Sequence, residues 1–287
     1  MKTFDFINNN VEIMNLNTLK STFKENDIFG NPLKGMYHYE VIDRLADMCR
    51  NHGLNFEIEE IFAAQNKNKQ TPGVVILPQI EAVQGGNAIE AHILRRVYST
   101  IRIKDGENDE TTTTIATAYH QDGIQIAFGP CVKVCHNQTI MGAKRTSSNF
   151  GKSGVSTEEM FNSVENWLSN FFEYREKDLR IIEKMKGIEC TQNDVLKIIG
   201  LLTMHRVMKD SSNRNLSERV KTYPFTQAQI SKFTEDYTER YLINPIMSLW
   251  DVYNIATEFY KPDRMEIPNV LNQNIEFYNM VENLYKF

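Results

Sequence analysis

The spacing of hydrophobic residues changes near residue 154 of the chain. Before that point several stretches alternate apolar and polar side chains, as strands do; after it apolar residues recur every three or four positions, as on amphipathic helices. The pattern predicts an α+β fold, with an N-terminal helix and an antiparallel sheet followed by an all-helical C-terminal unit. We expect an N-terminal arm over residues 1–37, a sheet domain over 38–153 and a helical domain over 154–287.

The first residues are polar and weakly periodic, which is why we interpret them as an arm; they end in turn signals at Gly30 and Gly35. From Tyr39 the spacing becomes helical, and Gly53 stands where a C-terminal cap is expected. Alternation over residues 54–58 predicts a strand, and the polar run 65–73 predicts a loop. The apolar positions of the predicted helix are Val41, Ile42, Leu45, Met48 and Cys49.

A long strand is predicted over residues 91–104, because its alternate side chains sort into an apolar set and a largely polar set. A turn over 105–109 and the β-branched residues 111–119 predict a hairpin with a returning strand, and shorter strands are expected at 124–128 and 132–135. One face, with Ile93, Val97, Ile101 and Ile103, resembles a core; the other, with Leu94, Arg96, Tyr98, Thr100, Arg102 and Lys104, is expected to be basic and solvated.

Helix-start signals recur in the second half. Ser156 or Thr157 precedes a long amphipathic helix, and residues 191–194 and 226–229 have the spacing of capping boxes. Further helices are predicted over 249–260 and about 271–285. The aromatic residues Trp167, Phe171, Trp250 and Tyr253 fall at helical spacings and are assigned to the core rather than to a ligand cage.

Composition places the chain among folded globular proteins. Its 287 residues are 41% hydrophobic and 24% charged, with a formal net charge of −5 that argues against strong non-specific affinity for duplex DNA. There is no long apolar run or secretory signal, and the cysteines lack a disulfide-like framework, so we expect a reduced protein in a bacterial cytoplasm with no membrane partner. Those cysteines are Cys49, Cys131, Cys135 and Cys190.

Motifs that would indicate enzymatic chemistry are incomplete. Gly151-Lys152-Ser153 ends like a phosphate loop, but Thr146 occupies the position of the required glycine, so a hinge between the two halves is the better interpretation. His120 and Asp122 could form a general-base pair, but no nucleophile accompanies them. Cys131, Cys135, His136 and His120 lack the paired spacings of a zinc site, so we predict no metal, no cofactor and no catalytic residue.

Residues 123–157 contain no Asp or Glu, although acidic residues outnumber basic ones in the whole chain. Together with the basic strand face, this segment offers cations to follow a phosphate backbone and an aromatic platform for bases, which are the requirements for binding a single strand. A solvated sheet face with a basic loop is the alternative. The candidate nucleic-acid-binding residues are Arg96, Tyr98, Arg102, Lys104, Lys133, Lys144, Arg145 and Lys152.

Three segments resemble a known family. Residues 122–139, which run through Gly129-Pro130 to Val134-Cys135-His136-Asn137, resemble the core signature of phage/plasmid-like proteins of unknown function from bacterial mobile elements. Residues 193–200 and 248–258 are similar to the helical tail of a related group, so the likeness spans about residues 74–260. The resemblance implies a fold and a mobile-element origin, and no catalytic residue.

A second likeness concerns topology. A helix ending near Gly53, a strand, a long hairpin and a basic segment resemble the core of the single-strand annealing proteins, whose curved sheet holds one DNA strand in an oligomeric ring. Two hypotheses follow. The first is a non-catalytic protein that binds single-stranded nucleic acid, to anneal or protect it, as a homo-oligomer. The second is an anti-defence or regulatory protein-interaction module, whose acidic helical half contacts a host protein.

Overall fold

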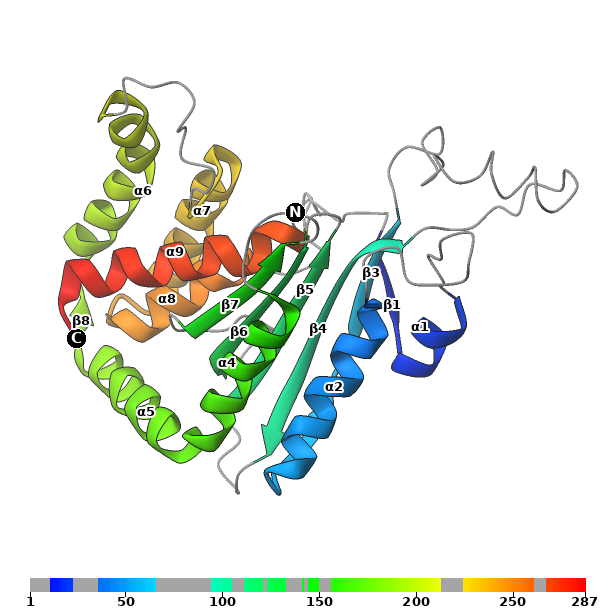
Figure 1. The fold of residues 1–287 in the computed structure, drawn as a ribbon. Helices are drawn as coiled ribbons and strands as arrows, with labels where there is room; N and C mark the ends of the chain where they lie inside the picture. The colour runs from blue at the N-terminus through cyan, green and yellow to red at the C-terminus, as the bar shows by residue number, and fades with distance from the viewer. Residues whose placement is uncertain are drawn as a thin grey trace, which may run out of the picture.

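The computed structural model describes residues 11–22, 36–65, 94–104, 111–120, 123–132, 141, 144–149, 156–212, 224–260 and 267–287. These residues form an α+β structure, as the sequence predicts: an antiparallel sheet comes first along the chain and helices dominate the second half (Figure 1).

The sheet contains seven strands within the described ranges. Their order is β1-β3-β4-β5-β6-β7, and β2 pairs with the same edge of β4 as β3 does, further along that strand. Every pair is antiparallel. The strands are β1 (Val11–Met14), β2 (Asn55–Ile58), β3 (Ile61–Gln65), β4 (Leu94–Lys104), β5 (Thr111–His120), β6 (Gly123–Val132) and β7 (Lys144–Asn149).

The central hairpin matches its prediction. Ile103 lies opposite Thr113 and Val97 opposite Tyr119, so β5 returns along β4 as expected, although the turn at 105–109 lies outside the described residues. The next strand, β6, includes the predicted strand 124–128 and extends further, to Val132, whereas residues 133–135 of the second predicted strand lie outside the described residues. Strands β3 and β7 were not predicted, since neither has a clear alternation of apolar and polar residues.

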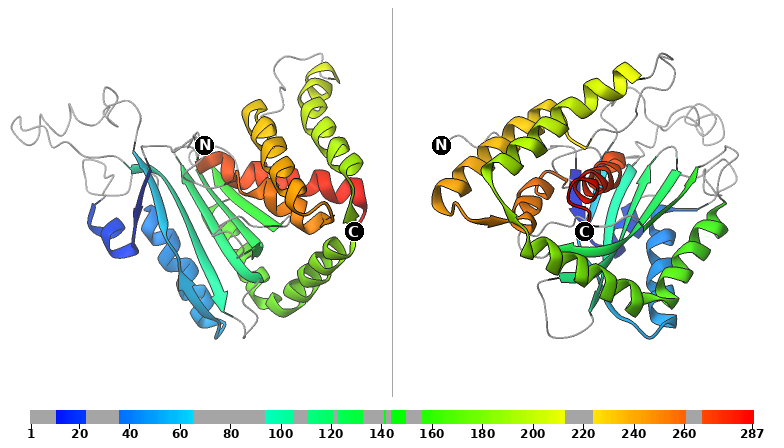
Figure 2. Two further views of the ribbon diagram at one scale, coloured as in Figure 1. Left: turned by 180° about the vertical axis from the view of Figure 1, so that it is seen from behind. Right: turned by 90° about the vertical axis from the view of Figure 1, so that its left-hand side faces the viewer.

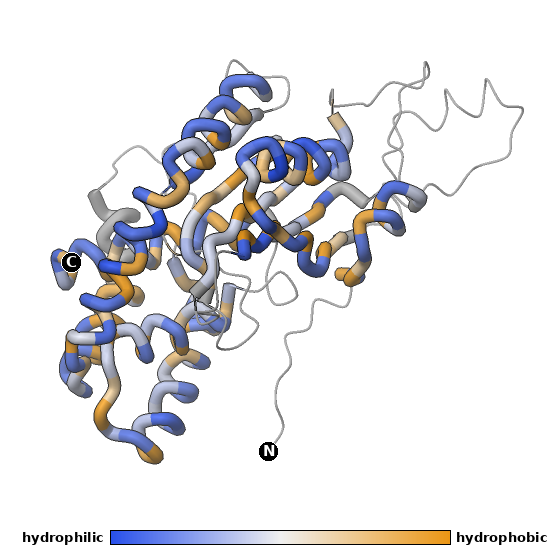
Figure 3. The backbone as a smooth tube through the Cα atoms, turned by 90° about the horizontal axis from the view of Figure 1, so that it is seen from below, coloured by the Kyte–Doolittle hydropathy of each residue, from blue (hydrophilic) through white to orange (hydrophobic). Residues whose placement is uncertain are grey.

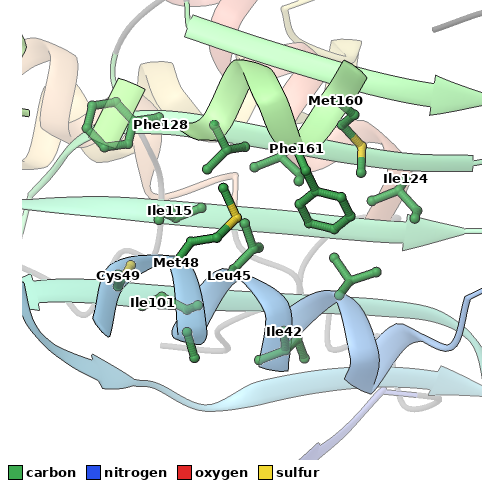
Figure 4. Close-up of a cluster of buried hydrophobic side chains, with 14 of the residues drawn as sticks. Ile42, Leu45, Met48, Cys49, Ile101, Ile115, Ile124, Phe128, Met160 and Phe161 are labelled. Atoms are coloured by element: carbon green, nitrogen blue, oxygen red, sulfur yellow. The ribbon is translucent and has the colours of Figure 1, made fainter. Parts of the chain in front are cut away.

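One face of the sheet is covered by α2 (His38–Asn51), α4 (Thr157–Ser169) and the start of α5 (Phe171–Gly187). Helix α2 was predicted from its apolar spacing and ends before Gly53, whose φ of +67° favours glycine. Its fully buried side chains pack on the strands, and burying each large one contributes about 1.5–3 kcal/mol. Figure 4 shows this core, with Ile42, Leu45, Met48 and Cys49 from α2, Ile101, Ile115, Ile124 and Phe128 from the strands, and Met160 and Phe161 from α4.

Part of the predicted arm belongs to this sheet. Within residues 1–37, β1 pairs with β3 at the sheet edge and α1 (Leu16–Thr22) buries Leu19 completely in the core. Residues 11–22 are therefore not an arm. The polar composition was misleading because a short edge strand and a helix of 7 residues need few apolar side chains to attach to a sheet.

The opposite face of the sheet is contacted by α9 (Ile267–Tyr285), the last helix of the chain (Figure 2). Val270 and Leu271 of α9 lie in a small cluster of their own with Phe62 and Tyr98, together with Ala116, Ala118 and Ala127. The sheet is thus placed between α2 and α4 on one side and α9 on the other.

The remaining helices form a second hydrophobic cluster with the C-terminal half of α9. The two predicted capping boxes are present: Thr191 and Asp194 bond reciprocally, as do Thr226 and Gln229. The predicted assignment of Trp250 and Tyr253 to the core is confirmed, since both side chains are buried. This part consists of α6 (Gln192–Ser212), α7 (Gln227–Ile243) and α8 (Leu249–Thr257), with β8 (Glu189–Cys190) pairing with β9 (Met247–Ser248).

The two cores do not separate at the expected boundary between residues 153 and 154. Helix α4, which lies after that boundary, packs against the sheet, and α9 from the end of the chain contacts the other sheet face. The long predicted helix at Ser156 is two helices, α4 and α5, joined at Asn170. Along the helical stretches of Figure 3, hydrophobic and hydrophilic residues follow one another closely, as on amphipathic helices. Helices α4 and α5 each bury one such face.

Candidate nucleic-acid interface

Four of the candidate cations project from the same face of the sheet. Alternate residues of β4 place Arg96, Arg102 and Lys104 on the face that α9 contacts. The strand register extends this face to Arg145 of β7, which lies opposite Ala127. We call this side of the sheet the basic face; it brings together residues that are about 50 positions apart in the chain.

Tyr98 lies on the basic face. The sequence predicted that it would be solvated, and it is not. Its side chain is completely buried, and it packs among Phe62, Val270 and Leu271. Burial also raises the pKa of the phenol well above its ordinary value. The prediction of an exposed base-stacking platform is therefore wrong for this arrangement of α9, because a helix far away in sequence supplies the cover.

Two cations of the basic face have acidic partners. Arg102 forms a salt bridge with Glu59, whose other carboxylate oxygen accepts a hydrogen bond from the hydroxyl of Thr100 at 2.8 Å. Lys104 Nζ lies 2.8 Å from Glu57 Oε2, and both of these side chains are about half exposed. An exposed pair of this kind contributes little to stability, so Lys104 can exchange its partner for a phosphate at small cost.

Arg145 has no carboxylate in its described hydrogen bonding. It is exposed, and its guanidinium donates to the amide oxygen of Asn272 on α9 at 2.8 Å. Arg96 is partly buried on β4, in register with Ala64 of β3.

Lys144 is on the wrong side of the sheet to join these residues. Its ammonium lies 4.2 Å from the ring centre of Tyr174 and 3.8 Å from Asp178 Oδ1, both on α5. Burial lowers the pKa of Lys144, while the nearby Asp178 opposes that shift. The predicted grouping of Lys144 with Arg145 is wrong, because neighbouring residues of a strand point to opposite faces.

The last two candidates, Lys133 and Lys152, lie outside the described residues, as does the Gly151-Lys152-Ser153 motif. So do Asp122 and His136.

The basic face also holds polar atoms that the sequence did not reveal. Arg102 Nε, Thr114 Oγ1 and Gln125 Oε1 are buried and have no hydrogen-bond partner. Arg102 lies directly opposite Thr114, and Gln125 lies opposite Ala118. Buried polar atoms are nearly always paired, so three unpaired atoms on one sheet face mark an unusual surface. In the sequence, only Gln125, a long amide side chain between Ile124 and Ile126, indicated that this face would hold such a polar group.

The structure gives no support to a zinc site in the part of the chain that it describes. Cys49, Cys131 and Cys190 are buried and form no disulfide, and no group of three or more potential metal ligands occurs among the described residues. Burial raises the pKa of the Cys49 thiol to about 12, which keeps it protonated and unreactive. Cys135 lies outside the described ranges.

The helical part carries a different surface. Helix α6 has apolar residues around its circumference: Val195, Ile198 and Leu202 are buried, while Leu196 and Met204 are exposed. Further large apolar side chains are 70–87% exposed between the end of α7 and β9, namely Leu242, Ile243 and Ile246. Exposed apolar groups of this size are typical of contact surfaces.

None of the helices in the described ranges is long and apolar enough to cross a bilayer. Neither the curated proteins nor the solved structures include a match to the chain. A family model described as a domain of unknown function (DUF932) matches residues 79–279, which include the sheet from β4 onwards and most of the helical part. The chain therefore belongs to the DUF932 family.

Proposed function

We propose that this protein binds single-stranded nucleic acid through the basic face, without catalysis. The proposal is supported by one observation above all: Arg96, Arg102, Lys104 and Arg145 share a sheet face that also carries three unpaired buried polar atoms. Cations can contact phosphates, while unpaired donors and acceptors suit base edges. The likeness to phage/plasmid-like and annealing proteins supports a mobile-element origin, a cytoplasmic location and a role in recombination as an oligomer.

The experiment is fluorescence anisotropy with a labelled oligo-dT at several salt concentrations. Charge reversal of Arg145, which is exposed and bonded to a neutral amide, is expected to weaken binding and to flatten the salt dependence, because one phosphate contact is lost. The matched control is Arg180→Glu on α5, since Arg180 is an exposed arginine whose helix packs on the other side of the sheet. The absence of binding at low salt, or equal effects of the two reversals, would refute the proposal.

We propose a second candidate, a protein-interaction module acting on a host protein, on a separate observation. The exposed apolar residues of α6 and of the α7–β9 connection lie outside the basic face, so the proposed nucleic-acid site does not account for their exposure. Capture of one defined host protein that persists after nuclease treatment and is lost in Ile243→Lys would favour this candidate. Capture that depends on intact nucleic acid would instead favour the first.

A further inference from the structure

Helix α9 is attached to the rest of the protein through two different surfaces. Its C-terminal half places Phe277, Tyr278 and Val281 in the large helical cluster. Its N-terminal half rests on the basic face through Val270 and Leu271. The two halves therefore contact different parts of the protein, although Asn274 at the end of the first half accepts a hydrogen bond of 3.5 Å from the hydroxyl of Tyr253 in the helical cluster.

The attachment to the basic face uses two apolar side chains of α9, Val270 and Leu271, which are 0% and 2% exposed. Opposite Val270 and Leu271, the strands present three alanines, Ala116, Ala118 and Ala127, besides the rings of Phe62 and Tyr98. At its edge, the exposed guanidinium of Arg145 donates a hydrogen bond to Asn272 Oδ1 at 2.8 Å. Small side chains let the helix approach closely, and burying Val270 and Leu271 contributes about 1.5–3 kcal/mol each.

Residues 267–274 are also a poor helix by composition. The segment has the β-branched Val270 and asparagine at positions 269, 272 and 274. Asparagine and β-branched residues are among the weaker helix formers, and tertiary contact rather than propensity must hold such a segment in place. The helical state of this half therefore depends on its contacts, chiefly those with the sheet.

Several polar atoms beside that contact are unsatisfied. Arg102 Nε, Thr114 Oγ1 and Gln125 Oε1 lie on the basic face beside the alanines that α9 contacts, and Gln273 Oε1 of α9 is also buried without a partner. Each buried unpaired atom costs free energy relative to a paired one. Apolar residues at these positions would hold α9 without that cost.

A nucleic-acid strand would satisfy this face better than α9 does. Its base edges carry both donors and acceptors, which are what Arg102 Nε, Gln125 Oε1 and the Thr114 hydroxyl lack. Tyr98, which packs beside Val270 and Leu271, has the aromatic ring that a base can stack on once those side chains leave. The exposed cation Arg145 would exchange Asn272 for a phosphate.

We propose that residues 267–274 of α9 are a displaceable cover, and that a single nucleic-acid strand binds the basic face by replacing them. The bases then contact Tyr98, Arg102, Thr114 and Gln125. This inference rests on the proposed function, and it explains how a face whose aromatic residue is fully buried can still serve as the binding site.

The test compares Leu271→Ala with Val281→Ala by anisotropy against labelled oligo-dT. Both residues are buried on α9, at 2% and 1% exposure, but only Leu271 lies on the basic face. Weakening the cover raises the fraction of molecules competent to bind, so Leu271→Ala is expected to tighten binding by about fivefold or more. Val281→Ala is expected to bind with wild-type affinity.

Hydrogen exchange on the wild-type protein gives an independent measurement if Leu271→Ala does not fold. Added oligo-dT is expected to accelerate amide exchange in residues 270–274, because displaced residues lose their helical hydrogen bonds. Unchanged or weaker binding by a folded Leu271→Ala, or slower exchange in this segment, overturns the cover. If the folded wild-type protein does not bind oligo-dT at all, the proposed function fails and the cover fails with it.

Discussion

Asp178 and His38 are expected to oppose one another in the acid stability of this protein. Asp178 on α5 is only 7% exposed, and its Oδ2 has no hydrogen-bond partner. Burial raises its pKa from 3.8 to about 6, although the positive charges of Lys144 and Lys177 act in the opposite direction. His38 is 1% exposed, and burial lowers its pKa from 6.5 to about 4.

The signs follow from proton linkage. The folded state binds a proton at Asp178 more tightly than the unfolded state, so this residue adds stability as the pH falls from about 6 towards 4. At His38 the folded state disfavours the proton, so stability is lost as the pH falls from about 6.5 towards 4. A difference of one pKa unit between the folded and unfolded states is worth about 1.36 kcal/mol of stability. Each of these two groups therefore changes the free energy of unfolding by about 3 kcal/mol. The two contributions therefore nearly cancel in the wild-type protein.

Separate removal of the two groups should reveal both contributions. Urea unfolding of Asp178→Asn, His38→Gln and the wild-type protein at pH 7, 6, 5 and 4 gives each free energy of unfolding. Relative to wild type, Asp178→Asn should become about 3 kcal/mol less stable between pH 7 and 4, and His38→Gln should become more stable by a similar amount. A difference from wild type that stays constant with pH, for either variant, would show that burial does not perturb that group.

Three further local features are tested by the same urea measurement. Gly53→Ala should destabilise the fold by about 1 kcal/mol because its φ is +67°, whereas Gly200→Ala, at an open position within α6, should stabilise it by about as much; equal signs would contradict this reasoning. Ser156→Ala should cost about 1 kcal/mol because its hydroxyl accepts from Glu159 N in a capping box, while Ser169→Ala, at the other end of α4, should change stability by less than half of that. Leu45→Ala should cost about 2–5 kcal/mol, since Leu45 is completely buried between α2 and the sheet; a loss below 1 kcal/mol would mean that this core is loosely packed.

Local sequence patterns predicted the elements that carry their own apolar periodicity. Helix α2 and the β4–β5 hairpin were found because a core face recurs at the helical or strand period within each segment. Strand β7 reads Lys144-Arg145-Thr146-Ser147-Ser148-Asn149 and has no such face; it is a strand because β6 offers a free edge to pair with. Strand β1 is short and lies at the other end of the sheet. Edge strands depend on their neighbours, which local patterns do not describe.

The candidate site shows the same division between what a pattern determines and what it does not. Alternation along β4 correctly separated Arg96, Arg102 and Lys104 from the core-facing isoleucines, since side-chain direction is a local property of a strand. Lys144 and Arg145 were grouped because β7, the strand that carries both, was not recognised from the sequence. Their alternation between the two sheet faces therefore went unnoticed. Ion pairs of Arg102 and Lys104 with β2 and its following turn were equally invisible, because they depend on which strands are adjacent.

Whether a sheet face is open depends on residues far away, but the face itself carries a signal. Tyr98 is flanked across β5 and β6 by Ala116, Ala118 and Ala127, all on the face that α9 contacts. Alanine is a poor strand former, so it is not favoured on a solvated strand face. A helix that packs on the strands requires side chains short enough for close approach. Successive alanines at alternate positions therefore indicate an approaching element. The same short side chains would admit a base above Tyr98, so one set of residues serves the helix in the free protein and the ligand that we propose replaces it.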